Sequence, residues 1–458
     1  MINFRKMGNR YLLTDIAGNF NFVSEKELLS SSFKMISKSK TIGIIKNMKD
    51  INSSIFKGPG LHIIVLTIRC NHSCLYCQAS AKKYNKNYDM DIKTAKKSID
   101  FAFKTLRDDG LSIEFQGGEP LMNWEVLKES IIYARKKESE TKKPIELGVV
   151  TNLSLMDKEK ADFLIENDVY ICSSLDGNEY IHNNNRIFCK GNSYKRTIKW
   201  LKYFSSRAGW RTKNGIRKFY PRPNALLTVT KKSLKYPKEI VSEYVRLNLR
   251  YIFTRPFMPF GYANNPNILK KISYSGEEFI DFYKKILNEV IDYNKKGIDI
   301  KERTARIFLT KILRKKDSHY LDIRNPCGAS IGQLAYNYNG DIFTCDEGRM
   351  LWAMGDGFFK VGNIFESKYE DVIKSDKTKL CVSSSILDSQ VKCFRCVYKP
   401  YCGVCPVYNY VTQNSVNGNM VDNLRCTIYT GVLDYLFELI QDKEVLKIFK
   451  RWVRYDFR

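Results

Sequence analysis

The sequence lacks the features that would place the protein in or across a membrane. Its longest apolar runs, such as IIVLTI at residues 63–68, are far shorter than the roughly 20 residues of a transmembrane helix. The opening residues, MINFRKMGNRYLL, contain no apolar core of a signal peptide. Neither an internal repeat nor a low-complexity tail is present. We therefore expect a cytoplasmic protein with no membrane partner.

Acidic residues are scarce relative to basic ones. The chain has 76 Lys and Arg against 49 Asp and Glu, a formal charge of +27. Such a charge can indicate nucleic acid or an acidic peptide as partner. The lysines are scattered rather than gathered on one element. We therefore interpret the positive charge as a sign that lysine is simply the usual polar residue of this chain. Residues 207–222, RAGWRTKNGIRKFYPR, are interpreted as a solvated loop, with nucleic-acid stacking as the alternative.

Thirteen cysteines are present, and they are clustered. A cytosolic protein does not use them as a disulfide framework, so clustering favours metal or cluster binding. Cys70, Cys74 and Cys77 follow the spacing C-x3-C-x2-C. Zinc and ordinary electron-transfer clusters normally take four protein ligands. Three thiols fit a [4Fe–4S] cluster whose fourth iron binds a small molecule; a partial zinc site or core thiols are the alternatives.

The pattern of the chain predicts an α/β protein. Residues 1–57 read as a small unit with a hairpin around an Ala-Gly turn, a short helix capped by Ser24, and a linker from residue 45. From residue 61 strands and helices alternate, as in a parallel sheet or open barrel. The predicted strands span 61–69, 111–116, 145–152, 169–177, 224–230 and 251–257. In such folds function lies at the carboxyl ends of the strands, where the cysteine loop and the segments GGEP, TN, SLDG and RPF all fall.

Three cysteines after the first strand of a β/α barrel resemble the radical S-adenosylmethionine (SAM) superfamily. The resemblance implies a partial (β/α)6 TIM-type barrel over residues 58–310. It implies a [4Fe–4S] cluster on Cys70, Cys74 and Cys77, with SAM chelated by the free iron. An electron from the reduced cluster would cleave SAM to a 5′-deoxyadenosyl radical, and the cofactors carry this chemistry. A flavodoxin or ferredoxin is the expected electron donor.

The same resemblance assigns residues to SAM. Tyr76 would pack near the adenine, and Ser174 and Asp176 would hold the ribose. Arg186 would meet the SAM carboxylate, unless it is an ordinary surface arginine. His182 is expected to be structural.

The segment GGEP matches the motif that faces the SAM ammonium in this superfamily. It consists of Gly117, Gly118, Glu119 and Pro120. Glycines let the backbone approach closely. A plain β-turn is the alternative. Gln116 is a weaker candidate near the same part of SAM.

A second group of cysteines begins at residue 327. It resembles the SPASM extension of radical SAM peptide maturases, expected over residues 311–430, although the last spacing is C-x2-C rather than C-x3-C. The resemblance implies an outer [4Fe–4S] cluster on Cys393, Cys396, Cys402 and Cys426. It implies an inner cluster on Cys327, Cys345 and Cys405, which is either open or closed by Cys381. Zinc ribbons are the alternative.

Asp346 directly follows Cys345. In related anaerobic sulfatase-maturating enzymes the matching aspartate takes a proton from the substrate. Asp346 is therefore a candidate base, or else a hydrogen-bonding partner of the cluster loop. Residues 431–458 are expected to form one amphipathic helix packed on the body.

Strings along nearly the whole chain, among them RCNHSCLYCQAS and YNYNGDIFTCDEGRMLWAMGD, resemble the His-Xaa-Ser system radical SAM maturases. This resemblance implies a ribosomally made His-Xaa-Ser precursor peptide and a second radical SAM partner protein. The expected activity is oxidative modification of that peptide, with cross-linking as the first interpretation. The alternatives are formylglycine formation on a protein, a nucleic-acid-binding iron–sulfur protein, and a non-catalytic subunit. Residues 1–57 would recognise a leader peptide or cap the barrel.

Overall fold

The computed structural model describes residues 2–29, 58–82, 85–105, 107, 109–213, 216–318 and 320–454. The chain divides into two compact units. The barrel unit comprises Pro59–Arg303 and Gln333–Thr378, and the cysteine-rich unit comprises Met1–Gly58, Thr304–Gly332 and Lys379–Arg458. These units divide the chain differently from the segments 1–57, 58–310, 311–430 and 431–458 that the sequence suggests. Most of the expected linker after residue 45 lies outside the described residues.

Six parallel strands form the centre of the barrel unit. Each pairs in parallel with the next in the order β13-β12-β8-β7-β6-β4. The strands are β4 (Leu61–Thr67), β6 (Leu111–Gly117), β7 (Ile145–Thr151), β8 (Val169–Ser174), β12 (Asn224–Val229) and β13 (Tyr251–Pro256). Parallel pairing brings all six carboxyl ends to one edge, so the partial (β/α)6 fold predicted from the sequence is confirmed.

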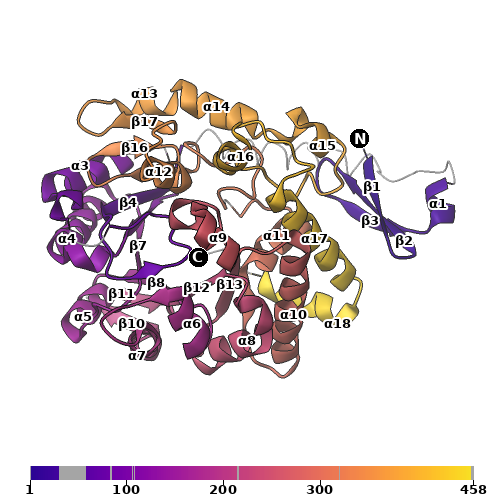
Figure 1. Cartoon of the computed structure of the whole chain (residues 1–458), viewed down its shortest axis with the longest axis horizontal. Helices are drawn as coiled ribbons and strands as arrows, with labels where there is room; N and C mark the ends of the chain where they lie inside the picture. Colours follow the sequence, from indigo (N-terminus) through magenta and orange to yellow (C-terminus); the bar gives the residue numbers. More distant parts are fainter. Residues whose placement is uncertain are drawn as a thin grey trace. The chain divides into compact units, whose positions relative to one another are not determined.

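Helices connect these strands and cover the outer side of the sheet (Figure 1). Their apolar residues recur at helical spacing, which buries one face of each helix. Polar side chains close their amino ends: Asp91 accepts from the backbone of Thr94, and Ser275 forms a capping box with Glu278. The connecting helices are α3 (Ile92–Ala102), α4 (Trp124–Thr141), α5 (Lys158–Glu166), α6 (Glu179–Asn185), α7 (Ser193–Ser206), α8 (Pro237–Arg246), α9 (Pro266–Ile272) and α10 (Gly276–Lys295).

Four further strands extend the sheet at its two ends, which the sequence analysis did not anticipate. β14 (Lys301–Glu302) pairs with β13, and β15 (Gln333–Tyr336) pairs in parallel with β4. β16 (Asp341–Phe343) and β17 (Lys360–Asn363) follow as antiparallel strands, with α12 (Asp346–Trp352) between them and α13 (Tyr369–Ile373) after β17. Ala335 and Phe343 pack into one core with Ile63, Val65 and Ile68 of the first barrel strand and its end. Residues 333–378 are therefore part of the barrel unit.

The basic segment at residues 207–222 is a hairpin rather than a loop. It consists of β10 (Gly209–Lys213) and β11 (Ile216–Tyr220). One face is held by Asp168, which forms ion pairs with Arg211 and with Lys218, the latter at 2.9 Å. The opposite face presents Trp210 and Phe219, which are both exposed.

The cysteine-rich unit begins with a three-stranded antiparallel sheet of β1 (Ile2–Met7), β2 (Arg10–Asp15) and β3 (Phe20–Val23), followed by α1 (Glu25–Leu29). The hairpin predicted from the sequence is present, with β1 added to it. Thr14 donates to the carbonyl of Val397 at 2.7 Å, and Tyr401 donates to the carbonyl of Gly18 at 3.0 Å. The amino-terminal strands thus pack on the segment that carries Cys396 and Cys402.

The rest of this unit is helical. Its helices are α11 (Arg303–Arg314), which begins at the boundary, α14 (Asp376–Ser384), which crosses it, α15 (Val391–Phe394), α16 (Pro406–Gln413), α17 (Leu424–Leu439) and α18 (Lys443–Trp452). The single helix expected at residues 431–458 is instead two helices, because Asp442 caps a new amino end by accepting from Glu444 and Val445. Within the described ranges, no helix has both the length and the apolar character needed to cross a membrane.

Candidate active site

The cysteine loop starts directly after β4 and is anchored by an ion pair. The Arg69 guanidinium binds both carboxylate oxygens of Asp89, at 2.7 and 2.5 Å, and Thr67 donates to the same carboxylate at 2.6 Å. The backbone N–H of Cys70 donates to the carbonyl of Lys82 at 2.8 Å, which closes the loop. Sequence reasoning did not single out Arg69 or Asp89, because residues 20 apart give no local signal.

The three thiols of this loop are largely removed from water. Cys70 and Cys74 are buried and Cys77 is half-buried. Burial raises the pKa of the Cys74 thiol to about 12, and it raises that of Cys70 further. The Cys70 sulfur also accepts the backbone N–H of His72 at 3.4 Å. Such thiols become thiolates when a cationic centre compensates the charge, which an iron–sulfur cluster does.

The described residues contain no group of three or more His, Cys, Asp or Glu side chains arranged to hold a single metal ion. A [4Fe–4S] cluster places each thiolate on a different iron, so its ligands stand farther apart than those of one ion. The thiol set of the loop therefore fits the cluster in its donor chemistry.

Gly117 and Gly118 are required by a close approach between two backbones. Gly118 donates to the carbonyl of Thr67 at 2.8 Å, and Glu119 donates to the carbonyl of Arg69 at 2.7 Å. A Cβ atom on Gly117 would lie 2.2 Å from the Thr67 oxygen, and one on Gly118 would lie 2.2 Å from the Arg69 oxygen. The glycine pair thus extends the β4–β6 ladder into the cysteine loop, rather than forming a plain β-turn.

Glu119 ties the ends of two strands together. Its side chain is fully buried and accepts from Thr151 Oγ1 at 2.6 Å, from the backbone of Asn152 at 2.7 Å and from that of Leu121 at 3.1 Å. Burial raises the pKa of this carboxyl to about 6 against the effect of these donors. Pro120 begins a short 3-10 turn after it. The contact between this segment and the SAM ammonium stays a prediction.

Tyr76, Asp176 and Arg186 lie together beside the loop. The Tyr76 hydroxyl donates to Asp176 at 2.5 Å and accepts from Arg186 Nη1 at 2.8 Å. Arg186 reaches this place because β9 (Arg186–Ile187) pairs with β5 (Ser73–Cys74), with Arg186 opposite Cys74. Its buried Nε atom has no hydrogen-bond partner within the described part of the chain. A half-buried guanidinium with a spare, buried donor suits an anionic ligand such as the SAM carboxylate.

Two histidines brace this group. His72 Nε2 and His182 Nε2 contact the Ser193 hydroxyl at 2.8 and 2.9 Å, and the backbone N–H of Asp176 donates to His182 Nδ1 at 3.4 Å. Burial lowers the pKa of both histidines, that of His72 to about 3. They are neutral supports at ordinary pH. His182 therefore has the structural surroundings that the sequence suggested, and His72 was missed.

The concave side of the sheet is charged. Gln116 donates to Glu114, and Glu114 interacts electrostatically with Arg255, Arg303 and Asp346. β6 and β13 are separated by three strands in the sheet, so only curvature brings Glu114 and Arg255 within reach of one another. The sequence of β6 could have predicted this charged side. Its polar residues alternate with buried apolar ones, whereas a strand of a parallel sheet is usually apolar on both faces.

Two other predicted site residues, Ser174 and Asp346, have no described contact with the Tyr76, Asp176 and Arg186 group. Ser174 ends β8 and is half-buried, at the strand edge where the sequence placed it. Asp346 begins α12 and is ion-paired with Arg349, whose Nε and Nη2 lie 3.0 and 2.5 Å from Asp346 Oδ1. Both side chains are buried, and Arg349 Nη1 has no partner among the described residues. Arg349 was not anticipated.

The outer cysteine set gathers within the cysteine-rich unit. Burial, followed by the charges of Cys396 and Cys426, raises the pKa of Cys393 to about 12. Burial and the charges of Cys396, Cys393 and Cys426, in that order, likewise raise the pKa of Cys402. The four thiols are therefore neighbours. The Cys396 sulfur accepts the backbone N–H of Tyr398 at 3.4 Å.

The cysteines assigned to an inner cluster come from both units. Cys345 belongs to the barrel unit, while Cys327, Cys381 and Cys405 belong to the cysteine-rich unit. Cys345 and Cys405 each begin a short helix, and each sulfur accepts a helix N–H at 3.4 Å, a setting that favours thiolates. The Ser385 hydroxyl links Cys327 and Cys381: it accepts from the Cys327 backbone at 2.9 Å and donates to the Cys381 carbonyl at 2.6 Å.

Comparison with protein families defines the class of the barrel. Residues 64–216 match the model of the radical SAM superfamily. This span holds the cysteine loop, the GGEP segment and the Tyr76, Asp176 and Arg186 group. The protein thus has the α/β radical SAM fold, and the cofactors of this family are a [4Fe–4S] cluster and SAM.

Curated relatives extend beyond the barrel. The radical SAM cyclopropyl synthase TigE of Paramaledivibacter caminithermalis is 24% identical over 475 residues, covering 96% of this chain and 88% of the relative. The cysteine-type anaerobic sulfatase-maturating enzyme of Clostridium perfringens is 22% identical over 375 residues, covering 80% of this chain and 93% of the relative.

Two solved structures share the fold. Native anSMEcpe with bound AdoMet superposes with a TM-score of 0.67 at 18% identity and covers 85% of this chain and 99% of its own. Streptococcus suis SuiB bound to its precursor peptide SuiA superposes with a TM-score of 0.57 at 16% identity and covers 91% of this chain and 97% of its own.

Proposed function

We propose that the protein is a radical SAM enzyme that oxidatively modifies a ribosomally made precursor peptide, with cross-linking of two residues as the first expectation. The observation that carries the proposal is the second group of cysteines, which begins at Cys327. A radical SAM barrel needs only the three thiols of its loop, yet a further four gather in the cysteine-rich unit, where Cys393, Cys396 and Cys426 surround Cys402. That set suits an additional [4Fe–4S] cluster, which would take an electron from the substrate radical as that radical is oxidised.

The residues of the barrel unit have distinct parts in this proposal. Cys70, Cys74 and Cys77 hold the cluster, and Gly117 and Gly118 let the backbone of the GGEP segment approach the cysteine loop. Arg186 binds the SAM carboxylate through its spare donor, and Tyr76 fixes Arg186 against Asp176. When bound, the reduced cluster and SAM supply a 5′-deoxyadenosyl radical that removes a hydrogen atom from the peptide.

Asp346 is the proposed base that takes the second hydrogen as a proton. Arg349 holds its carboxylate in one orientation by two hydrogen bonds to a single oxygen, which leaves the other oxygen available. A cross-link then forms with loss of one hydrogen atom, one proton and one electron from the peptide. We further propose a His-Xaa-Ser type of peptide, a second radical SAM protein as partner, and a flavodoxin or ferredoxin as reductant.

The test is anaerobic turnover. Reconstituted, reduced protein is incubated with SAM, with and without a His-Xaa-Ser type precursor peptide, and 5′-deoxyadenosine and peptide mass are measured in one run. Peptide-stimulated 5′-deoxyadenosine with a peptide lighter by two hydrogens supports the proposal. Exchange of Cys70, Cys74 and Cys77 for alanine should abolish it, and activity in that variant would refute the radical SAM assignment.

Formylglycine formation is the second candidate, favoured by the likeness to sulfatase-maturating enzymes along 80% of the chain. Oxidation of serine to formylglycine also removes two hydrogens, so mass alone does not separate the candidates. An aminooxy probe does, because it reacts with the aldehyde and leaves a carbon–carbon or thioether cross-link unchanged.

A further inference from the structure

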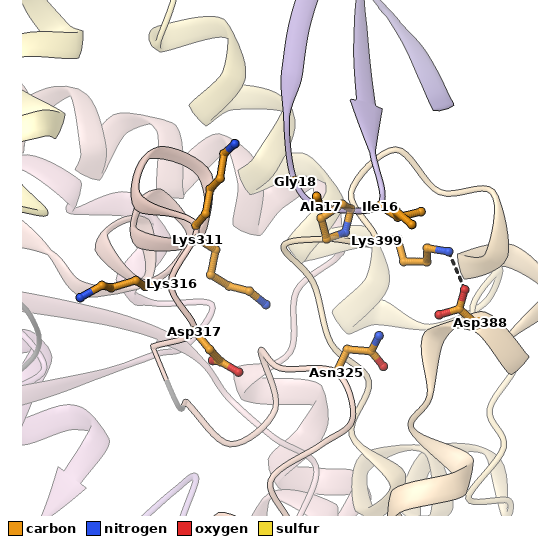
Figure 2. A pocket seen from close by; sticks show the side chains of 11 residues that line it. Ile16, Ala17, Gly18, Lys311, Lys316, Asp317, Asn325, Asp388 and Lys399 are labelled. Atoms are coloured by element: carbon orange, nitrogen blue, oxygen red, sulfur yellow. Dashed lines mark hydrogen bonds and ion pairs between the residues drawn. The ribbon is translucent and has the colours of Figure 1, made fainter. Parts of the chain in front are cut away.

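A lysine-rich pocket of about 240 Å³ lies within the cysteine-rich unit, outside the site described above. The turn of the amino-terminal hairpin at Ile16–Gly18 forms one side, and the residues at the end of α11 form another (Figure 2). Lys399 and Pro400 come from the segment between Cys396 and Cys402. The pocket is thus built from three parts of the chain that are far apart in sequence.

Positive charge exceeds negative charge in this pocket. Four lysines line it, namely Lys311, Lys315, Lys316 and Lys399, against two aspartates. Each aspartate has a cation of its own: Asp388 is paired with Lys399 at 2.7 Å, and Asp317 lies 3.7 Å from Arg324. Figure 2 shows the ion pair of Lys399 and Asp388 at the wall.

Two of the lysines meet neutral oxygens. Lys311 Nζ donates to the carbonyl of Ile323 at 2.8 Å and to that of Cys402 at 3.5 Å, while Lys315 Nζ donates to Asn19 Oδ1. An ammonium group has three donors, so these carbonyls leave Lys311 one N–H for a ligand. The charge of Asp317 also acts on Lys311, but two aspartates stand against four lysines, so the pocket keeps an excess of positive charge.

The pocket is preorganised. Asp15 Oδ1 accepts from the backbone of Ala17 and of Asn19, both at 2.9 Å, which fixes the hairpin turn. Gly18 has a φ of +74°, and a Cβ there would lie 3.3 Å from the Tyr401 ring, so the turn fits closely against the cysteine segment. A rigid site loses less conformational freedom when a ligand binds.

We propose that this pocket binds the carboxylate of an acidic side chain of the precursor peptide. The inference rests on the proposed function in taking a peptide as substrate. The volume holds one or two side chains, which suits an extended peptide better than the broad surface of a folded protein. Lysines bind carboxylates as compact point charges, and a low local dielectric strengthens the contact.

A binding experiment tests the pocket without turnover. The full chain is reconstituted and titrated against a fluorescein-labelled decapeptide of alternating Glu and Ala, without SAM or reductant, and anisotropy gives the Kd. A peptide with Gln in place of Glu is the ligand control. We expect the Glu peptide to bind more tightly and its Kd to rise with salt concentration.

The matched variants have equal charge. Lys315→Gln with Lys316→Gln changes two exposed pocket lysines, and Lys447→Gln with Lys450→Gln changes two exposed lysines of α18. We expect the pocket variant to weaken binding about tenfold and the α18 variant to stay within about twofold of the wild type. Equal losses would mean diffuse attraction to a basic protein and would overturn the proposal, as would no loss in the pocket variant.

A second variant adds an anion at the rim instead of removing cations. Ile16 is 45% exposed, so Ile16→Asp leaves the fold intact and places a carboxylate beside the lysines. This variant should also weaken binding of the Glu peptide about tenfold, and unchanged binding would overturn the inference. Because the readout needs no radical chemistry, failure of peptide turnover with the binding differences intact would refute the proposed function alone.

Discussion

Exchange of Gly118 for alanine should dislocate the cysteine loop. The new Cβ would lie 2.2 Å from the carbonyl oxygen of Arg69 and 2.6 Å from its carbon. Both atoms belong to backbone, so no side chain can turn away to make room. The two backbones must separate by about 1 Å to restore an ordinary contact.

The cost follows from the bonds that hold this approach. Separation weakens the hydrogen bonds from Gly118 to Thr67 and from Glu119 to Arg69, which measure 2.8 and 2.7 Å. Each contributes about 1 kcal/mol, and the added methyl group costs about 1–3 kcal/mol as overpacking. The total cost in stability is about 3–5 kcal/mol, and the strain falls on the backbone next to Cys70.

Iron content and SAM affinity measure the outcome. Gly118→Ala should lose the iron of the barrel cluster and bind SAM at least about tenfold more weakly, because Cys70 moves with Arg69. Gly148→Ala on β7 is the matched control, since its nearest neighbours would be 3.7 and 3.9 Å from the new Cβ. Wild-type iron and SAM binding in Gly118→Ala would refute the reasoning.

Three further predictions concern single side chains. His62 is buried between the hydroxyl of Tyr336 and a backbone carbonyl, and burial lowers its pKa to about 3. In the unfolded chain the same imidazole takes up a proton near pH 6.5. The free energy of unfolding therefore falls as the pH drops below 6.5, by about 2 kcal/mol at pH 5. His62→Gln should remove that part of the pH dependence of the urea midpoint between pH 7.5 and 5, and an unchanged dependence would contradict the assignment. Tyr76→Phe keeps the ring but frees its two polar partners, so the Kd for SAM should rise about tenfold in equilibrium dialysis, and a wild-type Kd would argue against this role. Asp346→Asn should retain 5′-deoxyadenosine formation within about threefold but lower modified peptide at least about a hundredfold by mass spectrometry; equal loss of both products would point to a structural role instead.

Local patterns were sufficient to predict the barrel. The six central strands lie close to the predicted ranges, because alternating turn signals and apolar runs report their own secondary structure. Their carboxyl ends hold the cysteine loop, the glycine pair and Asp176, as the order of elements required. The amino-terminal hairpin was also predictable, from period-two alternation around Ala17 and Gly18.

Contacts between distant residues were not predictable in the same way. Nothing near Arg69 in the sequence marks Asp89 as its partner, and nothing near Glu119 marks Thr151. The strands β15, β16 and β17 have only four, three and four residues, too few for their alternation to identify them. The place of β15 beside β4, on which β16 and β17 build, depends on pairing across more than 250 residues.

The sequence by itself determined the chemistry: which thiols are available, in what spacing, and at which end of a parallel sheet. Tertiary structure alone decided which side chains meet them. It placed Arg186 opposite Cys74, joined Tyr76 to Asp176, and gave Asp346 the guanidinium of Arg349 as its partner. The physical reason is that cysteine spacing and strand periodicity are local properties of a chain, whereas burial, ion pairing and backbone approach depend on distances that only folding sets.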